Sequence, residues 1–156
     1  MSDRPDLNDD FLDVLHALVD AGVEFLVVGA HALAAHGVVR ATGDLDILVK
    51  PSSANAARII EGLRAFGAPL SAHGVGRADF AKPGTVYQLG LPPRRIDILT
   101  SISGVTFDDA KSHAQTVHVG TITFHVPGRA ALLANKKATG RPKDLEDARR
   151  LEQLGD

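Results

Sequence analysis

The sequence predicts a mixed α/β (α+β) fold, in which a small mixed β-sheet is flanked by helices. Short branched apolar runs bounded by glycine or proline are typical of buried strands, and the amphipathic segments between them are typical of helices. Two alternating segments around Gly120 indicate a hairpin, followed by two C-terminal helices. The 156 residues are expected to form a single domain over 1–156, with a core at about 8–126 and a helical part at about 127–156.

The first half of the chain is expected to begin with a helix over residues 8–21. Asn8 can cap its start, and Gly22 can end it. The apolar run 24–28 predicts a short buried strand. The alanine-rich segment 29–37 that follows it favours a short helix.

The middle of the chain alternates between strand and helix patterns. Residues 45–49 predict a strand and about 54–66 a helix, which a preceding serine can cap. Residues 68–84 are rich in glycine and proline, so they are expected to be mostly loop. Two further strands are expected at 85–89 and 95–99.

The C-terminal third begins with the expected hairpin, formed by 115–119 and 121–126. A helix is expected to follow it, up to about residue 138, and a last helix over about 142–154. The spacing of apolar residues predicts the buried side of this last helix. That side consists of Leu145, Ala148, Leu151 and Leu154.

Composition excludes several classes of function. The chain is 44% apolar and 23% charged, which is enough for a real core. Only 4% of its residues are aromatic, and its net charge is −2, so neither a stacking platform nor a large nucleic-acid footprint is expected. The absence of cysteine excludes disulfides, zinc–thiolate sites and thiol nucleophiles.

The sequence also bears on where the protein is found. Residues 1–11 are acidic and lack the basic and then apolar pattern of a signal peptide. No apolar run approaches the roughly 20 residues that a membrane-spanning helix needs. We therefore expect a cytoplasmic protein that is not associated with a membrane.

Asp44 and Asp46 are the most informative pair of residues. Side chains of a strand alternate between its two faces, so these two carboxylates point the same way. Two like charges this close raise each other's pKa and favour a compensating cation. Mg²⁺ (or Mn²⁺) suits them, because such ions take oxygen ligands and usually bind one or two carboxylates together with substrate phosphates.

Asp97 supplies a third acid from another apolar run, where an unpaired carboxylate would be costly. Three acids on neighbouring strands could hold two metal ions about 4 Å apart. Other interpretations stay open, because Asp-x-Asp pairs also occur at strand ends without metal, and Asp97 could pair with Arg94 or Arg95.

Gly29 joins the first expected strand to a short helix, a turn that can hold phosphate or can simply connect the two elements. This turn and the Asp-x-Asp pair together resemble the signature of the nucleotidyltransferase superfamily, whose members share the polymerase-beta-like fold. The Arg-x-Thr-x-Asp-x-Asp form is similar to the bacterial branch of AbiEii-type toxins and related small proteins. The stretches concerned are Val28-Gly29-Ala30-His31-Ala32-Leu33, Arg40-Ala41-Thr42-Gly43-Asp44-Leu45-Asp46 and Asn135–Asp147.

The resemblance covers residues 23 to 151 and implies a metal-dependent enzyme that transfers NMP from a nucleoside triphosphate (NTP) to an acceptor. Asp44 and Asp46 would ligate the metal ions, and Asp97 would ligate the second ion and help to activate the acceptor hydroxyl. The acceptor would be RNA, a protein or a small molecule. An antitoxin partner is also implied, since the branch belongs to toxin–antitoxin systems.

The resemblance implies roles for residues around the nucleotide as well. Gly29 and the turn after it would hold the β- and γ-phosphates, and Lys136 would contact the triphosphate. Asp144 would orient Lys136 or the turn around it, while Arg40 and Thr42 would shape the nucleotide pocket.

Ala30 departs from the family pattern, which has serine or glycine after the turn glycine. Alanine has no hydroxyl to bond a phosphate oxygen, although His31 could supply a donor or could simply pack within the fold. A catalytically silent nucleotide-binding or partner-binding module therefore remains the alternative to an active transferase. A plain interaction domain, with the acids in structural ion pairs, is a third hypothesis.

Overall fold

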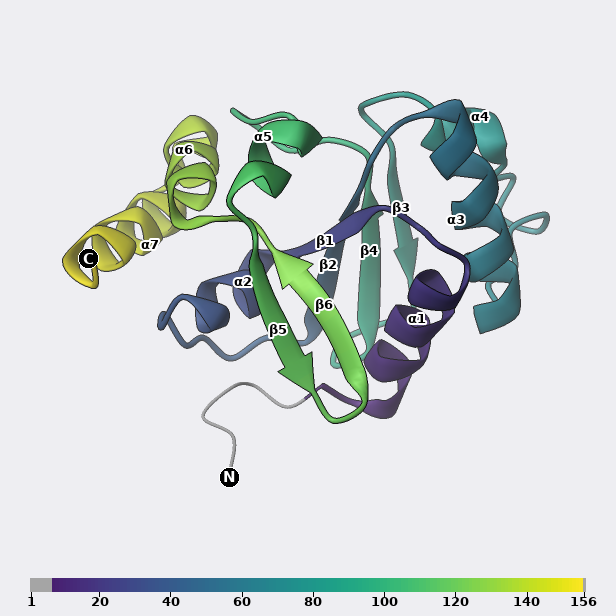
Figure 1. The fold of residues 1–156 in the computed structure, drawn as a ribbon, viewed down its shortest axis with the longest axis horizontal. Helices are drawn as coiled ribbons and strands as arrows, with labels where there is room; N and C mark the ends of the chain where they lie inside the picture. Colours follow the sequence, from purple (N-terminus) through teal and green to yellow (C-terminus); the bar gives the residue numbers. More distant parts are fainter. Residues whose placement is uncertain (1–6, 156) are drawn as a thin grey trace.

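The computed structural model describes residues 7–155 (Figure 1). Most of the acidic segment at the start of the chain lies outside the described residues. The strands are β1 (Phe25–Val28), β2 (Asp44–Val49), β3 (Val86–Leu89), β4 (Arg95–Leu99), β5 (Gln115–Val119) and β6 (Ile122–Val126). The helices are α1 (Asp9–Asp20), α2 (Gly29–Ala35), α3 (Ser53–Phe66), α4 (Arg77–Phe80), α5 (Phe107–Ser112), α6 (Arg129–Thr139) and α7 (Pro142–Gln153).

A four-stranded sheet in the order β1-β2-β4-β3 lies at the centre of the fold. β2 runs parallel to β4, whereas β1 and β3 run antiparallel to their neighbours, so the sheet is mixed. β5 and β6 form the separate hairpin. The predicted fold class is confirmed, while the division into a single domain with a core and a helical part stays a prediction. In the described part of the chain, no helix is both long and apolar enough to cross a membrane.

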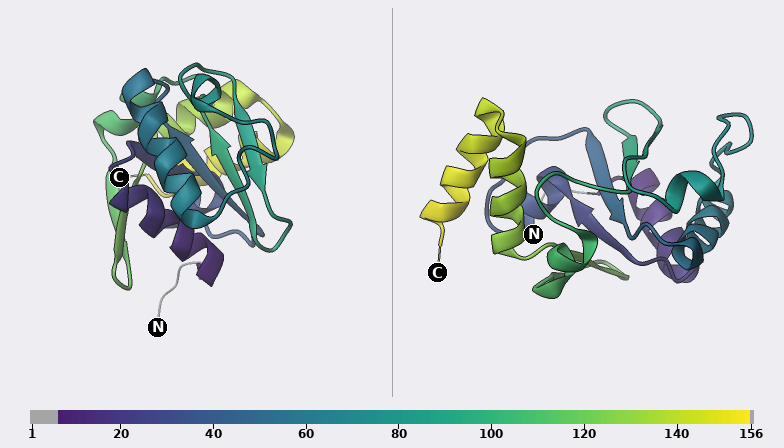
Figure 2. Two further views of the ribbon diagram at one scale, coloured as in Figure 1. Left: turned by 90° about the vertical axis from the view of Figure 1, so that its right-hand side faces the viewer. Right: turned by 90° about the horizontal axis from the view of Figure 1, so that it is seen from above.

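The two faces of the sheet carry different residues, because side chains alternate along each strand. On β2, Leu45, Ile47 and Val49 belong to the main hydrophobic core, which also contains residues of α1 and α3. Asp44 and Asp46 lie on the opposite face of the same strand. Figure 2 shows α6 and α7 at the end of the molecule away from α3. The main core thus leaves the acidic face of β2 free to form a site.

Asn55 connects helix α3 to the sheet. Its side chain is fully buried, accepts a hydrogen bond from Glu24 N (2.8 Å) and donates to the carbonyl oxygens of Glu24 (3.0 Å) and Lys50 (2.9 Å). We expect Asn55→Ala to lower the free energy of unfolding by about 3 kcal/mol, because buried backbone groups lose their partners. Urea denaturation measures this. Asn135→Ala, which removes a single exposed bond to Ser103 O, is the matched control and is expected to cost less than about 1 kcal/mol.

The expected loop over 68–84 contains the short helix α4. The Asp79 carboxylate accepts a hydrogen bond from the Gly76 N–H (2.9 Å), and Phe80 is buried in the main core. A single turn held by one cap and one apolar anchor is too short to produce a periodic pattern in the sequence.

The C-terminal helices α6 and α7 pack against each other. The expectation that Leu145 and Leu154 face inward is wrong, since these residues are 41% and 55% exposed. Acidic side chains take part of the inward face instead, because cations of neighbouring segments compensate their charge. The buried residues of α7 are Asp144, Asp147, Ala148 and Leu151.

Candidate active site

The three acids predicted from the sequence lie on one face of the sheet. β2 and β4 are parallel, and their register pairs Asp46 with Asp97 and Asp44 with Arg95. Paired residues of neighbouring strands point to the same face, and Asp46 and Asp97 also share a hydrogen bond. Asp97 therefore meets Asp44 and Asp46 at one place, although it follows them in the sequence by 53 and 51 residues.

The ionised form of Asp46 is destabilised by its surroundings. Burial, the charges of Asp97 and Asp44 and the hydrogen bond that protonated Asp46 donates to Asp97 raise the pKa of Asp46 from 3.8 to about 6, although the charge of Arg95 opposes the shift. One oxygen of Asp44, Oδ1, is buried without a hydrogen-bond partner in the described structure. A buried carboxylate oxygen without a compensating partner is costly. Asp44 and Asp46 are therefore suited to bind a cation.

Asp97 is in a different situation, because Arg95 already binds it. The Arg95 guanidinium donates from Nε to Oδ1 and from Nη2 to Oδ2 of Asp97, each at 3.0 Å. The ion pair considered from the sequence is thus present with Arg95, whereas Arg94 pairs with Asp10 (3.2 Å).

Gly29 is the first residue of α2 and lies directly against Asp46. Its φ of +69° is in the left-handed region, which favours glycine. A Cβ atom at this position would overlap Oδ2 of Asp46 and lie 3.1 Å from its Cγ. Glycine therefore serves two needs here: it permits the turn and it leaves space for the carboxylate.

Thr42 shapes the chain just before the acids. Its hydroxyl donates to the Asp44 carbonyl oxygen (3.2 Å) and accepts from the Asp44 N–H (3.1 Å). The segment between α2 and β2 also carries Arg40, whose Nε donates to Asp147 Oδ1 at 2.6 Å. Arg40 and Thr42 thus line the same pocket as the acids, while their role in shaping a nucleotide site stays a prediction.

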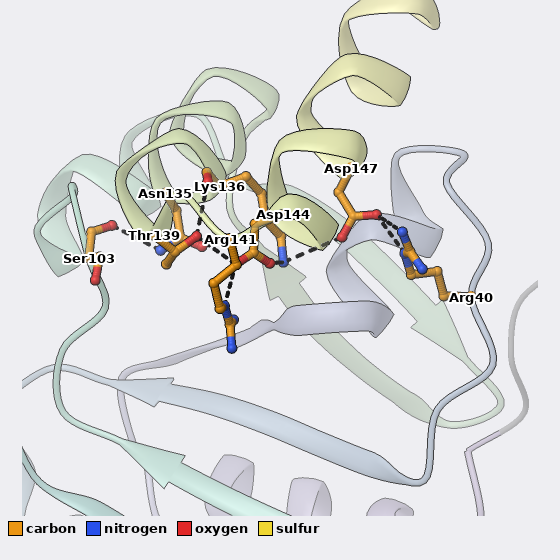
Figure 3. A network of polar contacts seen from close by, with 8 residues as sticks. All are labelled: Arg40, Ser103, Asn135, Lys136, Thr139, Arg141, Asp144 and Asp147. Carbon is orange, nitrogen blue, oxygen red and sulfur yellow. Dashed lines mark hydrogen bonds and ion pairs between the residues drawn. The ribbon is translucent and has the colours of Figure 1, made fainter.

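A network of cations and buried acids comes from α6 and α7 (Figure 3). Asp144 contacts Lys136 Nζ (3.4 Å), and its Oδ2 accepts hydrogen bonds from Thr139 (2.8 Å) and Arg141 (2.6 Å). Burial acts to raise the pKa of Asp144, but the bonds from Arg141 and Thr139 and the charge of Lys136 outweigh it and hold this pKa below its usual value. The expected pairing of Asp144 with Lys136 is present.

The acids of the sheet and the cations of the helices line one pocket of about 350 Å³. Its acidic side comes from β2 and β4, and its basic side comes from α6, α7 and the segment before β2. We call these the acidic wall and the basic wall. The acidic wall is Asp44, Asp46 and Asp97, and the basic wall is Arg40, Lys136, Arg141 and Lys143. Gly29, Ala30, Leu33, Thr42, Asp144 and Asp147 complete the lining.

The fit of a metal ion can be tested on these residues. Within residues 7–155, no group of three His, Cys, Asp or Glu side chains is arranged to hold a metal ion. Both oxygens of the third acid, Asp97, are bound by Arg95. Asp44 and Asp46 nevertheless fit a divalent cation that completes its coordination with phosphate oxygens. The unpartnered Oδ1 of Asp44 fits such a cation, because coordination would compensate this buried oxygen.

The structure decides between the two interpretations of His31 and adds Asp147 to the site. His31 is buried edge-on against Phe11, burial lowers its pKa, and it does not line the pocket, so the packing interpretation is the correct one. Asp147 was given no role from the sequence, although it lies one helical turn after Asp144 on the same face of α7.

A second hollow, of about 590 Å³, lies away from the predicted site between the end of α1, β1, α5 and the hairpin. Although it is larger, it contains none of the three acids or the basic-wall residues. The chemistry of the smaller pocket makes it the candidate active site, because charged groups converge there.

Comparison with known proteins supports the fold of the chain. No protein-family model matches the sequence, and no match was found among curated proteins. Among solved structures, the chain resembles a provisionally assigned nucleotidyltransferase from Thermotoga maritima, with a TM-score of 0.53 and 16% identity over 95% of this chain and 94% of that one. The protein therefore has a nucleotidyltransferase-like fold, in agreement with the superfamily resemblance.

Proposed function

We propose that this protein is a metal-dependent nucleotidyltransferase that transfers NMP from an NTP to an acceptor. The observation that carries the proposal is the single pocket that the acidic wall and the basic wall line together. A triphosphate complexed with a divalent cation matches this pocket. The carboxylates of the acidic wall suit the cation, and the Lys and Arg side chains of the basic wall suit the phosphate oxygens. The similar structure from Thermotoga maritima adds support from the fold.

In the proposed reaction, an acceptor hydroxyl attacks the α-phosphorus in line. The new P–O bond forms as the bond to the bridging oxygen of the β-phosphate breaks, and pyrophosphate leaves. Mg²⁺ or Mn²⁺, when bound by Asp44 and Asp46, supplies charge neutralisation at the phosphates. The proton of the acceptor passes to the acid pair Asp46–Asp97, and Arg40 and Lys136 hold the phosphate oxygens in place.

We further propose that the protein belongs to the branch of AbiEii-type toxins and acts in the cytoplasm, where NTPs are abundant. The Arg40-x-Thr42-x-Asp44-x-Asp46 motif supports this assignment. RNA or a protein would be the acceptor in that case, with a small molecule as the remaining option, and an antitoxin would be the partner.

The test is pyrophosphate release by the purified protein, with each of the four NTPs, Mg²⁺ or Mn²⁺, and RNA, protein and small-molecule acceptors. Metal-dependent release with one NTP and one acceptor class is expected, and EDTA should abolish it. If no combination releases pyrophosphate, the transferase proposal is overturned.

The second candidate function is a catalytically silent nucleotide-binding or partner-binding module. Ala30 favours it, since this residue lines the pocket without a hydroxyl to offer a phosphate. This alternative predicts that NTPs raise the melting temperature without turnover, and that Asp44→Asn leaves the biological effect intact. An Ala30→Ser variant that gains pyrophosphate release would identify the missing hydroxyl as the cause.

A further inference from the structure

Asp147 lies between two cations of the basic wall, Arg40 and Lys136, although it is itself an acid (Figure 3). Its side chain is fully buried, and its Oδ1 accepts a hydrogen bond from Arg40 Nε at 2.6 Å. The second oxygen, Oδ2, lies 3.8 Å from Lys136 Nζ and has no hydrogen-bond partner among the described residues. One carboxylate thus faces two cations from separate segments.

Arg40 and Lys136 need such a group between them. Arg40 comes from the segment before β2 and Lys136 from α6, and neither segment fixes the other by backbone pairing in the sheet. Two cations that converge on one pocket repel each other, and this repulsion would turn their flexible side chains outward. A buried carboxylate between them offsets the repulsion and sets their separation.

Stability alone does not explain an acid at this position. A buried ion pair is often no more stable than apolar packing, and an oxygen without a donor adds a cost. The same face of α7 carries Ala148 and Leu151, so apolar side chains are accommodated there. The carboxylate also lines the pocket together with both cations, which connects it to the site.

We propose that Asp147 is a positioning residue, which holds Arg40 and Lys136 at the spacing that grips the oxygens of a polyphosphate. This inference rests on the proposed function, because it assigns the basic wall to the triphosphate. Asp147 touches the cations and not the substrate. Its loss should therefore weaken polyphosphate binding while the acidic wall keeps its affinity for a divalent cation.

The experiment measures two affinities by isothermal titration calorimetry on the full chain. Inorganic tripolyphosphate in EDTA probes the basic wall, and Mn²⁺ alone probes the acidic wall. For Asp147→Asn we expect about tenfold weaker tripolyphosphate binding, the scale seen for groups that orient ligating residues, and Mn²⁺ binding within about twofold of wild type. Glu146→Gln, an exposed residue of the same helix, is the matched control and should leave both affinities unchanged.

A double-variant cycle distinguishes positioning from a general loss of structure. If Asp147 acts through Arg40, the effect of Asp147→Asn should largely vanish in an Arg40→Met background. Unchanged tripolyphosphate binding in Asp147→Asn, or an equal effect in both backgrounds, overturns the proposal. Should Asp147→Asn not fold, Asp147→Glu keeps the charge but shifts it by one methylene, and unchanged binding by that variant likewise overturns it.

The experiments distinguish failure of the Asp147 proposal from failure of the transferase proposal. Wild-type protein that binds tripolyphosphate but releases no pyrophosphate from any NTP would contradict the transferase proposal and leave the role of Asp147 standing. Wild-type protein that releases pyrophosphate, with Asp147→Asn equal to it in binding, would contradict the role of Asp147 alone.

Discussion

Asp46→Asn is expected to lower the rate of NMP transfer by about 1,000-fold, because a cation ligand worth several kcal/mol in the transition state is lost. The same substitution is expected to stabilise the fold in the absence of metal. Ionised Asp46 is opposed by burial and by two neighbouring acids, and asparagine removes that charge. Activity and stability should therefore change in opposite directions.

The gain in stability of Asp46→Asn over wild type is expected to grow as pH rises. The pKa of Asp46 is raised from 3.8 to about 6 in the folded protein, so the unfolded state loses its proton first as pH rises. Wild-type stability relative to Asp46→Asn therefore falls between about pH 4 and pH 6 and stays low above that. At pH 7.5 we expect the variant to be more stable by about 1–2 kcal/mol, a value reduced for partial exposure of the group.

Urea denaturation in EDTA at pH 4 and pH 7.5 measures this difference. Asp13→Asn is the matched control, because it removes the same charge from an exposed residue away from the site. Asp79→Asn would not serve as the control, because Asp79 caps α4. Asp13→Asn should alter neither stability nor transfer. A variant at position 46 that is less stable than wild type at pH 7.5 would mean that the acids are compensated without a ligand.

Gly29→Ala is expected to lower the free energy of unfolding by about 2–4 kcal/mol. Part of the cost comes from a φ of +69°, and the rest comes from overlap of the new methyl group with Asp46. Relief of that overlap displaces the carboxylate, so Mn²⁺ binding should weaken at least about tenfold. Calorimetry and urea denaturation measure the two effects.

Gly67→Ala separates the two causes. Gly67 has a φ of +100°, but a Cβ there meets nothing within 4 Å. This control carries the backbone cost of about 1 kcal/mol without any collision and should leave Mn²⁺ binding intact. Equal losses of stability in the two variants, with Mn²⁺ binding unchanged in both, would show that Asp46 moves away at little cost.

The sequence allowed the sheet and the acids to be predicted for a clear reason. Apolar runs such as 45–49 and 95–99 predict strands whether the sheet is parallel or antiparallel. The alternation of side chains along a strand is enough to put Asp44 and Asp46 on one face. That Asp97 joins them depends on the parallel register of β2 and β4, which no local pattern encodes. The superfamily resemblance supplied that expectation.

The basic wall was harder to predict, because it is built from long-range ion pairs. Leu145 and Leu154 matched a helical apolar pattern and yet are exposed, while Asp144 and Asp147 are buried. A pattern of hydrophobicity treats every carboxylate as a surface group, so it misses acids whose burial depends on distant cations. The ion pair of Arg95 with Asp97 was among the alternatives, but only the structure distinguishes it from a pair with Arg94.

The hydrogen bond between Arg40 and Asp147 joins residues 107 positions apart. During synthesis on the ribosome, β2 and β4 emerge well before α7, so a growing chain can carry its carboxylates long before it has the helix that arranges the cations. Until α7 is complete, the acidic wall would be present, whereas Arg40 and Lys136 would lack the Asp147 carboxylate that pairs with them. Completion of α7 is therefore the last step in the assembly of the pocket, because Arg40 gains its buried partner only then.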